Sequence, residues 1–74
     1  MITNKDELEF GIFCIESVAN ALNITGNKVF DMLNKQSDIF SKYIIPNYNT
    51  LHTQSKEYII EDIVSLMRER GLSI

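Results

Sequence analysis

His52 is the residue with the clearest catalytic potential, because it is the one histidine of the chain and lies close in sequence to Tyr48 and Ser55. A histidine beside a hydroxyl group can act as a general base. Nucleophilic catalysis also needs a third group that orients the imidazole ring, and the sequence offers none near it. We therefore expect the His52 ring to bond backbone groups of its own loop, and we predict no catalytic residue and no enzyme activity.

The cysteine, the carboxylates and the glycines of the sequence likewise form no catalytic or metal-binding motif. Cys14 lies among apolar residues with no basic neighbour in sequence, which is typical of an inert core thiol. One histidine and one cysteine fall short of the three or four ligands that zinc takes, and Glu61 and Asp62 are expected on a solvated helix face. The three glycines lie too far apart to form a phosphate loop. No metal and no cofactor are expected.

Residues 18–33, VANALNITGNKVFDML, follow the pattern of a helix-turn-helix. This pattern describes how two helices pack, whereas DNA binding also requires positive charge and side chains that reach base edges. The second helix would offer Asn27, Lys28 and Lys35 for that purpose. It contains no arginine and also carries Asp31, so nucleic-acid binding is the alternative interpretation here and not the favoured one.

Aromatic and basic residues gather in the second half of the chain, which is the composition of many protein contact sites. We predict that a protein partner contacts this region through five side chains, namely Tyr48, His52, Gln54, Lys42 and Lys56. The opposing interpretation is that the aromatic residues of this region only fill the core.

The first half of the chain predicts two helices. Asn4 can cap a helix that runs to about residue 23, with Glu7 as its reciprocal partner, and Thr25 can cap a second helix over residues 26–35. The apolar stripe of the first helix comprises Leu8, Ile12, Ile15, Ala19 and Leu22, and Phe10, Phe13, Cys14 and Val18 broaden it. The buried side of the second helix is expected to comprise Val29, Phe30, Met32 and Leu33. Gly11 is expected where another helix approaches closely.

The second half predicts two more helices separated by a loop. A short helix capped by Ser37 or Asp38 should end at Pro46, and residues 46–54 are expected to form a loop. Thr53 or Ser55 can then cap a final helix that Gly71 closes. The fold class is therefore all-α, a compact bundle of about four helices with a helix-turn-helix-like pair in its first half.

The length and net charge of the chain limit the number of domains and the kinds of partner that we expect. The 74 residues suffice for one domain over residues 1–74, and a net charge of −3 gives no basic footprint for nucleic acid. No apolar run is long enough for a membrane span and the amino terminus is acidic, so we expect a cytoplasmic protein without a membrane partner. A core this small favours completion by a second copy, and a homodimer is expected.

The segment YIIPNYNTLHTQSKEYIIEDIVSLMRERG resembles the carboxyl-terminal half of an uncharacterised bacterial family of helical proteins about 70 residues long, a domain of unknown function. The family pattern Tyr-x-x-Leu-His-Thr-Gln corresponds here to Tyr48, Leu51, His52, Thr53 and Gln54. Some members are encoded beside a small protein that looks like an ADP-ribosyltransferase. The resemblance thus implies an antitoxin-like or immunity protein that works by binding and masking a neighbouring toxin.

Overall fold

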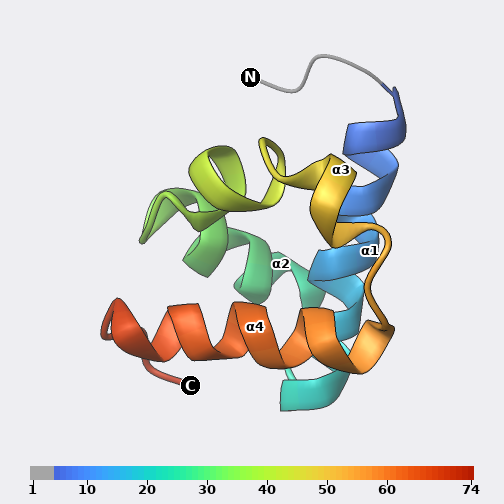
Figure 1. Ribbon diagram of the computed structural model, residues 1–74. Helices are drawn as coiled ribbons and strands as arrows, with labels where there is room; N and C mark the ends of the chain where they lie inside the picture. Colours follow the sequence, from blue (N-terminus) through green and yellow to red (C-terminus); the bar gives the residue numbers. More distant parts are fainter. Residues whose placement is uncertain (1–4) are drawn as a thin grey trace.

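The computed structural model describes residues 5–74, so the expected cap Asn4 lies outside the described residues. Within this range the structure is all-helical, which confirms the predicted fold class, and no strand occurs. In Figure 1, α4 lies across the lower end of α1, while the chain between α2 and α3 covers the other side of the core. The elements are α1 (Lys5–Leu22), α2 (Gly26–Phe30), η1 (Asp31–Lys35), η2 (Phe40–Ile44), α3 (Tyr48–Leu51) and α4 (Lys56–Glu69).

The turn between α1 and α2 is built from two helix caps. Asn23 adopts a left-handed backbone conformation with φ 58°, and the N–H of Ile24 donates to the carbonyl of Ala19 at 3.0 Å. These features form a Schellman motif, which ends a helix and satisfies its last carbonyl groups. Thr25 then caps α2 as predicted, because its hydroxyl oxygen accepts the N–H of Lys28 at 3.2 Å.

Two wide helical turns, η1 and η2, were not foreseen. Helix α2 runs directly into η1, where the N–H of Gln36 donates to the carbonyl of Asp31 five residues earlier at 3.0 Å. In η2 the N–H of Ile45 reaches the carbonyl of Phe40 in the same way, at 3.1 Å. Such π-type hydrogen bonding adds a residue to a turn without changing the apolar character of the segment, so sequence periodicity does not distinguish it from an α-helix. As predicted, η2 ends just before Pro46.

The expected loop over residues 46–54 is partly wrong, because it contains the short helix α3. The N–H of Leu51 donates to the carbonyl of Asn47 at 2.8 Å, and Leu51 is buried in the core. A single helical turn carries too few apolar positions to show a period in the sequence. The turn is instead stabilised by the burial of Leu51 and by contacts of Tyr48.

Helix α4 has a defined cap at each end. Ser55, and not Thr53, is its amino-terminal cap, since the Ser55 hydroxyl oxygen accepts the N–H of Tyr58 at 3.1 Å. At the other end Gly71 has φ 76°, and the N–H of Leu72 donates to the carbonyl of Met67 at 3.0 Å. The end of α4 is therefore a second Schellman motif, in which glycine takes the left-handed position.

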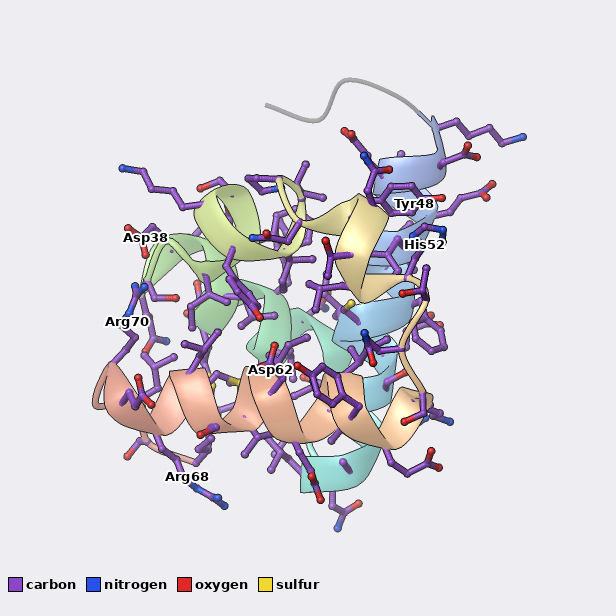
Figure 2. The ribbon with its side chains drawn as sticks, viewed as in Figure 1. Asp38, Tyr48, His52, Asp62, Arg68 and Arg70 are labelled. Atoms are coloured by element: carbon purple, nitrogen blue, oxygen red, sulfur yellow. The ribbon has the colours of Figure 1, made fainter. Side chains whose placement is uncertain are left out.

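Two side-chain interactions tie α4 to the middle of the chain. The Tyr43 hydroxyl donates a hydrogen bond to the Asp62 carboxylate, which raises the pKa of Tyr43 to about 12. Arg70 donates to the Asp38 carboxylate, and this hydrogen bond holds the pKa of Asp38 below its usual value. In Figure 2 the Asp38 and Arg70 side chains face each other at the end of the molecule opposite Tyr48 and His52.

The core is formed by one face of α1 and the inner faces of the elements around it. Phe10, Cys14 and Val18 of α1 are buried, together with Val29, Met32, Leu33, Ile39, Phe40, Ile44, Leu51, Ile59, Ile63 and Met67. The expected inner stripe of α1 is wrong in its first half, because Leu8 and Ile12 are 42% and 46% exposed. Phe30 is also exposed, at 39%, where a buried residue was expected. The helix buries the opposite face instead, where α3 and α4 pack against it.

Candidate protein-binding surface

Tyr48 begins α3 and His52 is its carboxyl-terminal cap, one helical turn later, and their rings stack. The ring centroids are 4.5 Å apart and the planes differ by 12°. The His52 Nδ1 atom lies 2.7 Å from the carbonyl oxygen of Tyr48. Since a carbonyl oxygen can only accept, Nδ1 is the donor in this hydrogen bond. The prediction that the ring bonds backbone groups of its own segment is thus confirmed, and Figure 2 shows both side chains beside α1.

Two phenylalanines of α1 extend this stack. Phe10 meets Tyr48 edge to face with centroids 5.5 Å apart, and Phe13 lies 6.3 Å from Phe10. The four rings Phe13, Phe10, Tyr48 and His52, which we call the aromatic cluster, therefore form a continuous series from α1 to α3. Phe10 is buried at its centre, whereas His52 is exposed and Phe13 is 40% exposed. The cluster thus fixes α3 to α1 and also presents aromatic surface to the solvent.

The sequence pointed to Tyr48 and His52 but not to the two phenylalanines. Phe10 and Phe13 lie three residues apart, a spacing that places both on one side of a helix. From the sequence, that spacing predicts only a broader apolar stripe on the first helix. Which helix face meets α3 depends on tertiary packing.

The structure does not join the other three predicted contact residues to the cluster. Lys42 lies on η2 and Lys56 begins α4, while the backbone N–H of Gln54 donates to the carbonyl of Leu51 at 3.0 Å in the turn between α3 and α4. All three side chains are exposed. Within residues 5–74, no hydrogen bond, ion pair or ring contact links them to Tyr48 or His52. Their part in binding stays a prediction.

The alternative nucleic-acid residues lie on the second helix of the pair. Asn27, Lys28 and Lys35 are exposed on α2 and η1. Asp31 lies between the two lysines and accepts a hydrogen bond from the Gln36 side-chain amide at 2.7 Å. The two lysines thus share their helix with a carboxylate, and their use in DNA binding also stays a prediction.

A comparison with known protein families assigns the chain to one of them. Residues 9–70 match the model of a family described as a protein of unknown function, DUF3791. The chain belongs to DUF3791. Neither a curated protein nor a solved structure gives a match.

The residues matched by the DUF3791 model include the aromatic cluster and the reactive groups Cys14, Tyr43 and Ser55. Cys14 is fully buried, and this burial raises the pKa of its thiol to about 12, so the thiol is protonated at neutral pH. Ser55 is engaged as the cap of α4, and the Tyr43 hydroxyl donates a hydrogen bond to Asp62.

Among residues 5–74, no three potential ligands converge as a metal site would require. No helix in the same range has the length and hydropathy needed to cross a membrane.

Proposed function

We propose that this member of DUF3791 is a non-catalytic protein-interaction module that binds a protein partner through the aromatic cluster. The observation that supports the proposal is the series of four contacting rings that reaches the solvent at Phe13 and His52. Aromatic side chains on a fixed backbone contribute much of the free energy of binding at protein interfaces, because they bury a large area and lose little conformational freedom.

Charge on α1 favours a basic partner surface. Asp6 and Glu9 are exposed on this helix, and Lys5 is its one basic residue. Acidic residues beside an apolar patch accelerate association with a basic partner and disfavour acidic ones. We also propose that this partner is a toxin, and that the chain masks the basic surface of the toxin as an antitoxin or immunity protein would.

The test is capture of partners from nuclease-treated extract of the native cell, followed by titration of the identified protein in purified form. We expect Phe13→Ala and His52→Ala to weaken binding at least tenfold, as loss of an interface hot spot does. Tyr58→Ala is the matched control, because Tyr58 is a 49% exposed aromatic residue without a ring contact to the cluster. Circular dichroism verifies that each variant is folded. Unchanged affinity in both cluster variants would refute the proposed surface.

The same experiment separates the DNA-binding alternative. Binding through the second helix would appear as material lost on nuclease treatment, with steep salt dependence and sensitivity to Lys28→Glu and Lys35→Glu. Binding through the aromatic cluster is expected to survive both lysine substitutions.

A further inference from the structure

A second apolar surface lies on α1, a different face from the one that carries the aromatic cluster. Leu8, Ile12 and Ile15 of α1 form a groove with Phe30 of α2 and Phe40 of η2, and its volume is about 540 Å³. Leu8, Ile12 and Phe30 are three of the exposed large hydrophobic residues of the described chain, and all three lie here. Contiguous apolar surface of this kind marks an interaction site more often than scattered exposed residues do.

The residues along α1 are arranged so that the groove can accept the same helix of another copy. Leu8 and Ile15 lie at equal distances on either side of a point between Gly11 and Ile12, and both line the groove. If a second α1 packs antiparallel about a two-fold axis at that point, Leu8 of one copy meets Ile15 of the other. Ile12 then lies at the centre of the contact, and the apolar residues of both copies are covered together.

Two charged residues of α1, Lys5 and Glu16, are spaced so that they can pair about the same two-fold axis. Lys5 precedes Ile12 by two helical turns, and Glu16 follows it by one turn and lines the groove. About the same two-fold axis, Lys5 of one copy lies within about 3 Å along the helix axis of Glu16 of the other, at a rise of about 1.5 Å per residue. Two symmetric ion pairs can therefore form. In the single chain Lys5 pairs with Glu9 at 3.8 Å, an exposed contact that costs little to exchange.

We propose that the groove between α1 and α2 is a homodimer interface in which α1 of a second copy packs antiparallel, with Lys5 of each copy paired to Glu16 of the other. A stable interface buries about 800 Å² per partner, which is about one sixth of the 4686 Å² surface of this chain. The residues of α1 that line the groove extend from Leu8 to Glu16, about 12 Å along the helix at a rise of about 1.5 Å per residue, and Phe30 of α2 widens the apolar surface beside them.

A charge exchange tests the proposed pairing. The dissociation constant of the wild-type dimer is measured by analytical ultracentrifugation and compared with those of Lys5→Glu, Glu16→Lys and the double variant. Each single substitution places like charges opposite each other and should raise Kd about tenfold, since two symmetric contacts change at once. The double variant should recover the wild-type Kd within about threefold, a range set by the small energies of exposed ion pairs.

Two further variants make the result decisive. Glu61→Lys changes the net charge by the same amount as Glu16→Lys, but on the exposed side of α4, and should leave Kd unchanged. Ile12→Glu, at a position already exposed in the single chain, should give a folded monomer. A wild-type chain that stays monomeric at high concentration, a dimer that survives Ile12→Glu, or a double variant that is not restored would each overturn the proposal.

Discussion

At the scale of single residues, Gly11 of α1 is the glycine with the closest neighbours. A Cβ atom built there would lie 2.8 Å from Cζ and 2.9 Å from Cε1 of the Phe40 ring. The sequence predicted that another element approaches α1 at Gly11, and the structure confirms the close approach. The ring is buried and packs edge to face on Phe30 with centroids 5.5 Å apart, so it has limited room to move.

Gly11→Ala is therefore expected to destabilise the fold. Alanine gains about 1 kcal/mol in helix propensity, whereas overpacking of a core costs about 1 to 3 kcal/mol, so a net loss of about 1 kcal/mol is expected. The measurement is the free energy of unfolding in urea. Gly26→Ala is the matched control, because the added Cβ would lie 3.7 Å from Ile15 Cγ2, an ordinary contact. A Gly11→Ala protein at least as stable as wild type would contradict the packing argument.

Tyr43 gives a prediction that depends on pH. Tyr43→Phe removes the hydrogen bond to Asp62 and should lower the free energy of unfolding at pH 7 by about 1 kcal/mol, since the contact is half-exposed. The pKa of Tyr43 in the folded chain, about 12, exceeds its usual value of about 10. The stabilisation is therefore complete below about pH 10 and is lost as the pH rises towards 12.

Urea titrations of wild type and Tyr43→Phe between neutral and alkaline pH measure this difference. Tyr58→Phe serves as the control, because Tyr58 is an exposed phenol and its removal should leave the free energy of unfolding unchanged. A gap between wild type and Tyr43→Phe that persists beyond pH 12 would show that the hydrogen bond is not its source.

At the scale of elements, local chemistry decided what could be predicted from the sequence. Caps and helix ends depend on residue types within a few positions, so Thr25, Pro46 and Gly71 were placed correctly. Helix α3 was missed because one turn has no period. The faces of α1 were misjudged for a different reason. The helix has apolar residues on more than one side, and the choice of Phe10, Cys14 and Val18 over Leu8 and Ile12 is made by the elements that pack against it.

The dependence on tertiary packing also explains why only part of the aromatic cluster could be predicted from the sequence. Tyr48 and His52 were identified from composition and lie together because they share one turn of α3. Phe10 and Phe13 are distant in sequence and join them only through packing of α1 on α3. Likewise, the groove next to Ile12 exists because Phe30 and Phe40 approach α1 without covering it. Residue spacing in the sequence does not show that α1 packs on α3 in the aromatic cluster, nor that Phe30 and Phe40 lie beside α1 at the groove.

Substitution of the two candidate caps of α4, Ser55 and Thr53, should affect the stability of the fold differently. Ser55→Ala should lower the free energy of unfolding by about 1 kcal/mol, because the N–H of Tyr58 loses its acceptor. Thr53→Ala should cost less than about 0.5 kcal/mol, since the Thr53 hydroxyl only donates to the Thr50 carbonyl at an exposed turn. Urea unfolding of both variants measures the difference, and the reverse order of costs would place the cap at Thr53.

At the scale of the whole molecule, one small core is flanked by two apolar surfaces with different geometry. The aromatic cluster is a series of contacting rings exposed at Phe13 and His52, whereas the groove is the surface proposed to bind a helix of a second copy. A dimer formed through the groove leaves both aromatic clusters free of the α1 to α1 contact. The proposed module would then present two equal binding sites, and a bivalent partner would gain affinity without any new contact.

The proposed dimer also predicts how stability depends on protein concentration. If folding and association are coupled, a tenfold increase in concentration stabilises the dimer by about 1.4 kcal/mol, or about 0.7 kcal/mol per chain. For a chain of this size that shift raises Tm by about 3 to 6 °C. Calorimetry over a range of concentrations should show this rise for wild type and a constant Tm for Ile12→Glu. A wild-type Tm that does not change with concentration would contradict the proposed dimer.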